Sequence, residues 1–184
     1  LGCLENAPLI VAVGGGLGAR SINTAMVEAL PKLAGVGAYA YIVAGKRNYA
    51  DVKEAAAPYH NVTVLEFVSE GLVDMLKAAD IVVTRASATV LQELAGLSKP
   101  IIAIPAKALG DQHKNAAVYE AADAAIIMSD DELAKPGHLG SQIVDLLHDA
   151  PRRASLAEHL HEFARPHAAR DVATILRELA EDHH

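Results

Sequence analysis

The residues of this chain best suited to chemistry lie between Thr84 and Glu93, in the order Thr-Arg-Ala-Ser-Ala-Thr-Val-Leu-Gln-Glu. The apolar run Ile81–Val83 before them predicts a buried strand, and apolar residues at helical spacing after them predict a helix that ends at residues 98–100. A helix that starts directly after a strand presents free backbone N–H groups, and its dipole favours an anion, most often a phosphate. Glu93, near the helix start, either accepts hydrogen bonds from a sugar diol or merely complements the helix dipole.

A second candidate is a glycine-rich loop near the start of the chain. The apolar run Pro8–Val13 predicts a buried strand, residues 14–20 read Gly-Gly-Gly-Leu-Gly-Ala-Arg, and residues 21–30 have helical apolar spacing. Glycines in this position let the backbone approach a phosphate, although a tight turn for packing has the same signature. The loop lacks the full G-x-G-x-x-G spacing, and no acidic residue ends the next strand. A dinucleotide site is therefore disfavoured.

The rest of the chain alternates between strand and helix patterns. Further strands are predicted at residues 38–44, 62–67, 81–84, 101–104 and 125–128, and helices at 49–57, 72–79, 111–121, 130–134, 139–148, 152–164 and 168–181. This alternation predicts an α/β fold with a doubly wound, mainly parallel sheet. Ligands of such sheets bind beyond the carboxyl ends of the strands, so the loops at 14–20, 68–71, 84–89 and 106–111 should converge on one edge.

Composition excludes several classes of function. The net charge of −7, without a Lys/Arg cluster, argues against a nucleic-acid partner. No apolar run approaches the roughly 20 residues that span a bilayer, and no signal peptide is predicted. The single cysteine excludes an internal disulfide and is compatible with a reducing cytoplasm. The nine histidines are scattered, without metal-ligand spacing, so no metal site is predicted.

Several segments in order carry a family resemblance: Gly-Gly-Gly-Leu-Gly-Ala-Arg-Ser-Ile-Asn (14–23), Glu-Phe-Val (66–68), Ala-Asp-Ile-Val-Val-Thr-Arg-Ala-Ser-Ala-Thr (79–89), Glu-Leu-Ala-Gly-Leu-Ser-Lys-Pro (93–100), Ile-Pro (104–105) and Asp-Gln-His-Lys-Asn-Ala (111–116). Over nearly its whole length the chain resembles the carboxyl-terminal domain of the MurG glycosyltransferases. These are two-domain enzymes of the GT-B fold that transfer N-acetylglucosamine from UDP-N-acetylglucosamine to a lipid-linked muramoyl pentapeptide, making lipid II from lipid I for peptidoglycan. The resemblance implies that this chain is one Rossmann-like half of such an enzyme.

The resemblance also implies a set of substrate-binding residues: Gly16, Leu17, Gly18, Val68, Leu72, Ala88, Thr89, Val90, Leu91, Gln92, Glu93, Asp111, Gln112 and Asn115. The loop at residues 16–18 would lie against the diphosphate, and the helix start at residues 88–89 would bind the phosphates. The main chain of Val68 would read the uracil edge, with Leu72 packing nearby. Glu93 would hold the ribose hydroxyls, and residues 111, 112 and 115 would contact the sugar.

The chain departs from the family pattern at four of its positions. Gly16 stands where the family often has Ser or Thr, Ser87 where it has Gly, Val90 where it has Thr, and Asp111 where it has His or Gln. A phosphate-facing hydroxyl therefore comes from Thr89, from Ser87 or from neither. The adjacent arginine at position 85 either pairs with phosphate or ties its loop to a carboxylate.

For the whole enzyme, the resemblance implies an inverting transfer without a cofactor or a tightly bound metal, with UDP-N-acetylglucosamine as a substrate. Residues 1–184 would form the donor-binding domain, with a linker remnant at 1–7 and terminal helices at 150–184. The amino-terminal acceptor domain, absent here, would supply the base and the lipid site, so this chain alone is expected to be inactive. The full enzyme is expected to be cytoplasmic, peripheral on the inner face of the membrane. The alternatives are a GT-B enzyme with another UDP-sugar or lipid acceptor, such as a glycolipid synthase or a sugar epimerase, and a non-catalytic nucleotide-sugar-binding domain.

Overall fold

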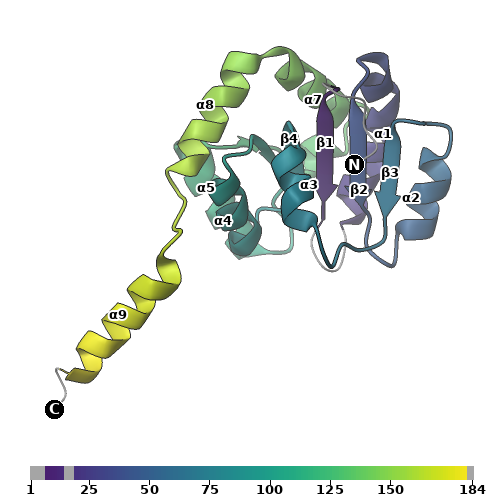
Figure 1. Cartoon of the computed structure of the whole chain (residues 1–184). Coiled ribbons are helices and arrows are strands. Elements are labelled where there is room, and N and C mark those ends of the chain that lie inside the picture. The colour runs from purple at the N-terminus through teal and green to yellow at the C-terminus, as the bar shows by residue number, and fades with distance from the viewer. Residues whose placement is uncertain (1–6, 15–18, 182–184) are drawn as a thin grey trace.

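The computed structural model describes residues 7–14 and 19–181, and its centre is one parallel sheet (Figure 1). The strands are β1 Leu9–Val13, β2 Tyr39–Val43, β3 Val62–Leu65, β4 Ile81–Thr84, β5 Ile101–Ala103 and β6 Ile126–Ile127, in the order β3-β2-β1-β4-β5-β6. Every pair of neighbours is parallel. The predicted doubly wound α/β fold is confirmed, and the strand order reverses between β1 and β4.

Helices cover both faces of the sheet. They are α1 Arg20–Gly35, α2 Tyr49–Ala56, α3 Leu72–Ala78, α4 Ala88–Leu97, α5 Gly110–Ala121, α6 Asp130–Leu133, α7 His138–His148, α8 Ala150–His161 and α9 Ala168–Glu181. Side chains of β1 alternate between the two faces, with Ile10 in the core under α1, α2 and α7, and Val11 in the core under α3, α4 and α5. Both faces of β1 are buried, which explains its unbroken apolar sequence.

Helix α1 runs five residues beyond the predicted end at Leu30, so that prediction was wrong at this boundary. The apolar spacing was interrupted by Pro31, which lies inside the helix. Proline removes one helical hydrogen bond. Leu30 and Leu33 are both fully buried against the sheet, and their burial offsets that loss.

The largest other differences from prediction are in β3 and α8. Strand β3 ends at Leu65 and not at residue 67, because its partner β2 ends at Val43, the residue paired with Leu65. Helix α8 begins two residues earlier than predicted and ends three residues earlier, at His161. Its early start has a local cause, since the Asp149 side chain accepts a hydrogen bond from the backbone N–H of Arg152.

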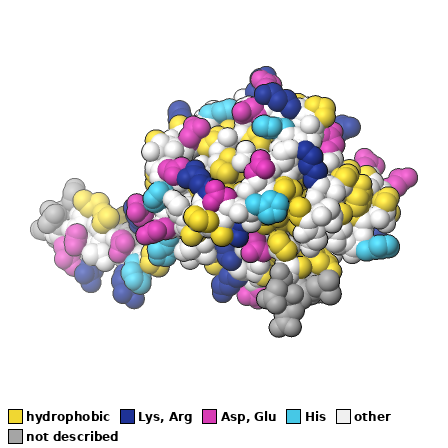
Figure 2. Space-filling model, turned by 90° about the horizontal axis from the view of Figure 1, so that it is seen from above, with side chains coloured by type: hydrophobic (Ala, Val, Ile, Leu, Met, Phe, Trp, Pro, Cys, Tyr) yellow, Lys and Arg dark blue, Asp and Glu magenta, His cyan; other side chains and the backbone are white. Residues whose placement is uncertain are grey.

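Helix α9 stands away from the sheet and its flanking helices (Figure 1), and Figure 2 shows it protruding from the body. It has an apolar stripe of four residues that are 53–62% exposed, namely Val172, Ile175, Leu176 and Leu179. Their spacing places them on one side of the helix, and no described residue of α9 is buried. Among the described residues, no helix is long and apolar enough to cross a bilayer.

Candidate functional site

The last residue before the undescribed segment, Gly14, lies close against the start of α1. A Cβ added to Gly14 would lie 2.5 Å from the backbone nitrogen of Ala19 and 2.8 Å from its Cβ. Only glycine fits here, because a side chain would collide with Ala19 immediately before α1. The predicted phosphate loop of Gly16, Leu17 and Gly18 lies outside the described residues, so its role remains a prediction.

A side-chain hydrogen bond joins strands β1 and β4 at the carboxyl edge of the sheet, where the strand order reverses. The buried Thr84 hydroxyl donates to the carbonyl oxygen of Val13 at a distance of 3.0 Å. This position outside the carboxyl ends is the usual location of ligands in open α/β sheets. The turn that starts α4 follows directly.

Helix α4 begins without a side-chain cap. Ser87 is the N-cap residue, but its side chain makes no capping hydrogen bond, and the backbone ladder starts with Leu91 N–H donating to Ser87 O at 3.0 Å. The N–H groups of the three residues between them have no helical acceptor. Ala88 and Thr89 are exposed, so this helix end can receive an anion.

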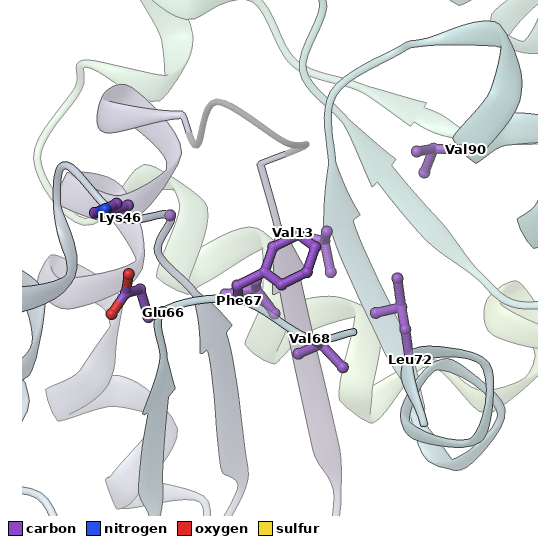
Figure 3. A pocket seen from close by; sticks show the side chains of 9 residues that line it. Val13, Lys46, Glu66, Phe67, Val68, Leu72 and Val90 are labelled. Atoms are coloured by element: carbon purple, nitrogen blue, oxygen red, sulfur yellow. The ribbon is translucent and has the colours of Figure 1, made fainter. Parts of the chain in front are cut away.

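One flank of α4 borders an apolar cavity of about 430 Å³ (Figure 3). It is lined by Val13, Val43, Gly45, Lys46, Glu66, Phe67, Val68, Leu72 and Val90. This lining includes three of the predicted residues, Val68, Leu72 and Val90. Lys46 and Glu66, which sequence reasoning missed, lie together at the other end of the cavity. Glu66 directly follows β3 and Lys46 lies three residues after the end of β2, and this position after neighbouring strands was the available signal.

Helix α4 also borders a second cavity, of about 630 Å³, which contains further predicted residues. Thr89, Gln92 and Glu93 line it, opposite the segment that joins α8 to α9. Glu93 has no hydrogen-bond or ion-pair partner among the described residues, so its carboxylate is available. The Gln92 amide donates to the Tyr119 hydroxyl at 2.9 Å. Leu91 is 0% exposed, which leaves only its main chain for a ligand contact.

The predicted sugar-binding amides already hold neighbouring loops. Gln112 Oε1 accepts a hydrogen bond from the Ala106 N–H at 2.9 Å, and Asn115 Nδ2 donates to the Ala86 carbonyl at 3.1 Å. A backbone N–H needs an acceptor and a carbonyl needs a donor, so both amide orientations are determined. Gln112 is left with its NH₂ group for a ligand, and Asn115 with its oxygen.

Asp111 differs from these two residues because its side chain is 97% exposed, and the one ion pair given for it within the described residues is with Lys114, at 3.8 Å. A fixed role for Asp111 therefore has no support in its contacts. No group of three or more His, Cys, Asp or Glu residues could hold a metal ion within residues 7–14 and 19–181. The expectation that the reaction needs no metal stays a prediction.

The sheet order, the helices on both faces and the ligand edge at β1 and β4 are those of a Rossmann-like domain, the unit from which GT-B glycosyltransferases are built. Residues 9–172 match the model of the glycosyltransferase family 28 C-terminal domain. The chain belongs to this family, which confirms the resemblance seen in the sequence.

Curated relatives of the chain share one printed name, UDP-N-acetylglucosamine--N-acetylmuramyl-(pentapeptide) pyrophosphoryl-undecaprenol N-acetylglucosamine transferase. The protein of Chlorobium luteolum is 31% identical over 178 residues, which are 96% of this chain and 48% of that protein. The protein of Salinibacter ruber is 32% identical over 180 residues, with the same coverage of 96% and 48%. The chain thus spans about half the length of these relatives.

Solved structures share the fold. The crystal structure of Acinetobacter baumannii MurG matches with a TM-score of 0.82 at 23% identity, covering 95% of this chain and 51% of that chain. A UDP-GlcNAc 2-epimerase from Neisseria meningitidis, bound to UDP-GlcNAc, matches with a TM-score of 0.69 at 14% identity, covering 95% of this chain and 45% of that chain. At these identities the likeness is one of fold.

Proposed function

We propose that this chain is the donor-binding half of a UDP-N-acetylglucosamine:lipid-linked muramoyl-pentapeptide N-acetylglucosaminyltransferase, which converts lipid I to lipid II with inversion. The observation that carries the proposal is the position of α4. Its uncapped start is followed by Val90, on the wall of the apolar cavity, and one turn later by Glu93, whose carboxylate has no partner among the described residues. A nucleoside diphosphate needs these three features side by side: an apolar slot for the base, a carboxylate for the ribose diol and N–H groups for the phosphates.

The donor is proposed to lie across the start of α4. The diphosphate binds the N–H groups at Ala88 and Thr89, and the ribose hydroxyls donate to Glu93. The uracil enters the 430 Å³ cavity between Val68, Leu72 and Val90. That volume lies within the range of about 300–1,000 Å³ that is usual for small-molecule sites.

During transfer, negative charge develops on the departing diphosphate as the acceptor oxygen bonds to the sugar carbon. Backbone N–H groups and the dipole of α4 stabilise that charge, and they do so without reorganisation because the turn is already held in place. The proposal assigns no cofactor to this chain. It assigns the NH₂ group of Gln112 and the oxygen of Asn115 to the sugar hydroxyls.

The remainder of the enzyme is proposed to be a second half, because the curated relatives are about twice as long as this chain. That half supplies the base and the lipid-acceptor site and covers the apolar stripe of α9. The complete enzyme is proposed to be cytoplasmic and to lie on the inner face of the membrane, where a lipid-linked acceptor is accessible. The isolated chain is then a binding domain without turnover.

Calorimetric titration with UDP-N-acetylglucosamine, UDP and ADP tests the donor site. We expect the two uridine nucleotides to bind and ADP to bind much more weakly. Glu93→Ala should weaken UDP binding by about 1.5–3 kcal/mol, the usual value of a hydrogen bond to a charged group. Glu120→Ala, an exposed carboxylate on α5 outside both cavities, is the matched control and should change nothing. Equal binding of ADP and UDP, or an unaffected Glu93→Ala variant, would contradict the proposal. Preference for another UDP-sugar would favour the alternative donors.

A further inference from the structure

We propose that Arg85 and Asp130 form a clamp that positions the phosphate-binding turn before α4. Neither residue lines the two cavities beside α4, and neither is assigned to the ligand. They act on the donor through the backbone of residues 86–89 and are thus positioning residues. The inference rests on the proposed function, since the anion that the turn receives is taken to be the donor diphosphate.

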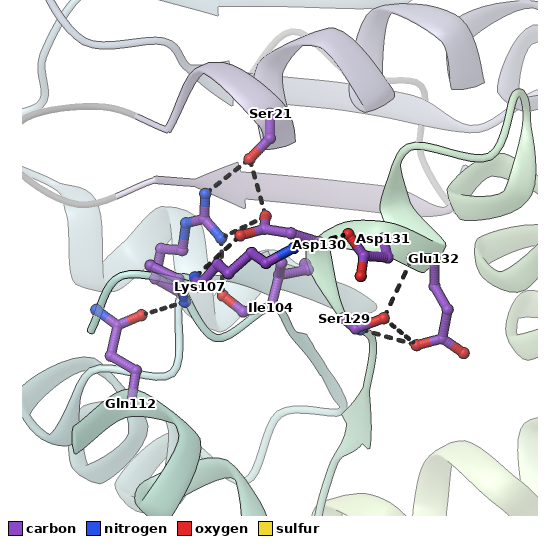
Figure 4. A network of polar contacts seen from close by, with 10 residues as sticks. Ser21, Ile104, Lys107, Gln112, Ser129, Asp130, Asp131 and Glu132 are labelled. Carbon is purple, nitrogen blue, oxygen red and sulfur yellow. Dashed lines mark hydrogen bonds and ion pairs between the residues drawn. The ribbon is translucent and has the colours of Figure 1, made fainter. Parts of the chain in front are cut away.

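The guanidinium of Arg85 contacts three different parts of the chain, through Ser21, Ile104 and Asp130, which Figure 4 labels. Nη1 donates to the Ile104 carbonyl at 3.2 Å and to Asp130 Oδ1 at 3.0 Å, and Nη2 donates to the Ser21 hydroxyl at 2.7 Å. Arg85 thus pairs with a carboxylate of its own chain, the second of the two alternatives that the sequence left open.

Asp130 completes the network from the other side. Its Oδ1 accepts from the Ser21 hydroxyl at 3.2 Å, and its Oδ2 accepts from the Lys107 N–H at 3.1 Å. Burial raises the pKa of Asp130, but the hydrogen bonds from Lys107, Arg85 and Ser21 and the charge of Arg85 outweigh burial and hold it below the ordinary value. The carboxylate is therefore ionised at neutral pH. The side chains of Arg85 and Asp130 are only 15% and 22% exposed, so solvent screens the pair weakly.

The network connects four segments that follow strands, two of which are the first turns of α1 and α6. Ser21 lies on the first turn after β1, Arg85 follows β4, Ile104 and Lys107 follow β5, and Asp130 follows β6. The next residue along, Ala86, is held by the Asn115 amide. The turn is therefore anchored on both sides immediately before the N–H groups that would meet phosphate. Such preorganised donors bind an anion without the cost of ordering the loop.

Arginine suits this position better than lysine does. Its planar fork reaches three acceptors at fixed angles, whereas an ammonium group is a point charge on a flexible stem. Arg85→Lys keeps the charge but cannot hold Ile104, Asp130 and Ser21 together. Asp130→Asn keeps the shape but loses the charge and one acceptor.

The experiment compares two ligands on the Arg85→Lys and Asp130→Asn variants. UDP contacts the turn through its diphosphate, whereas uridine occupies only the base cavity and the ribose carboxylate. We expect UDP binding to weaken about tenfold, the order that follows from misaligning hydrogen bonds to a charged group, and uridine binding to stay unchanged. The matched control is Arg152→Lys, because Arg152 makes a bidentate pair with Asp123 at the α5–β6 turn, away from this edge.

A second readout needs no ligand. Amide hydrogen exchange at residues 86–90 should accelerate in Arg85→Lys and stay at the wild-type rate in Arg152→Lys. Equal weakening of UDP and uridine, or unchanged exchange in Arg85→Lys, would overturn the positioning role. Failure of the wild-type chain to bind UDP would instead contradict the proposed function, and exchange would still decide whether the clamp orders the turn.

Discussion

At the scale of single residues, two amides at the site edge differ in what they can offer a ligand. Gln112 uses its oxygen to hold the Ala106 N–H, and Asn115 uses its nitrogen to hold the Ala86 carbonyl. A bound sugar would therefore find a donor at Gln112 and an acceptor at Asn115. Together they demand a fixed arrangement of hydroxyl groups, which is a physical basis for discriminating between sugars.

Gln112→Glu tests this polarity, because the carboxylate still accepts from Ala106 and loses only the donor. The added charge should weaken UDP and UDP-N-acetylglucosamine alike. The lost donor should weaken only the sugar nucleotide, by about 1 kcal/mol further. Calorimetry on both ligands measures the difference, and an identical loss for both would contradict a sugar contact at Gln112.

The sequence located these amides on the correct edge but did not show that each already had a main-chain partner. The reason is geometric, because Ala106 N–H and Ala86 O belong to irregular loops whose course no periodicity records. Likewise, the sequence could place Lys46 and Glu66 after neighbouring strands, but only the register of β2 and β3 shows that the two residues line one cavity. The position of Glu93 near the start of α4, in contrast, was predictable from the strand–turn–helix pattern, while its contact with a ribose stays a prediction.

At the scale of elements, the close approach of α1 and α7 depends on one glycine. A Cβ on Gly140 would lie 3.1 Å from both Cα and Cβ of Ala29. Gly140→Val should therefore destabilise the fold by about 1–3 kcal/mol through overpacking.

Gly96, on α4, is the control for that substitution because a Cβ there meets nothing within 4 Å. Gly96→Ala should stabilise the helix, by about 0.5–1 kcal/mol. Urea unfolding of both variants measures the two effects. A stabilised Gly140→Val variant would show that the helices can separate freely.

The clamp between elements also predicts an acid-dependent stability. Because the folded-state pKa of Asp130 lies below its ordinary value of 3.8, its contribution is present above that value and is lost as pH falls through the folded-state pKa. Asp130→Asn should be less stable than the wild type at pH 7, and the difference should shrink as pH falls below about 4. Thermal unfolding at several pH values checks this, and a constant difference would contradict it.

Element order was predictable because the spacing of apolar residues distinguishes strands from helices locally. Boundaries set by tertiary contacts were not. The continuation of α1 through Pro31 depends on burial of Leu33, and the early end of β3 depends on where β2 stops. Phe67, predicted to belong to a strand, is instead 69% exposed at the cavity.

At the scale of the whole molecule, the apolar stripe of α9 is the surface most open to association. In the isolated chain we expect this stripe to pair with a second copy at high concentration. Ile175→Glu should reduce that self-association in sedimentation experiments and leave UDP binding unchanged. Glu178→Gln, on the same helix but outside the stripe, is the control. If the Ile175→Glu variant associates as strongly as the wild type, a surface other than the α9 stripe mediates the association.

The bond between Thr84 and Val13 joins residues that are 71 positions apart. During synthesis β1 therefore emerges well before its neighbour β4, and until β4 arrives one side of an entirely apolar strand lacks its partner. The proposed nucleotide site lies at this same edge, so a chain that still lacks β4 has an exposed apolar strand and an incomplete site. A ligand that binds there stabilises only the completed fold. Ligand binding would therefore add stability to a newly made chain only after β4 has paired with β1.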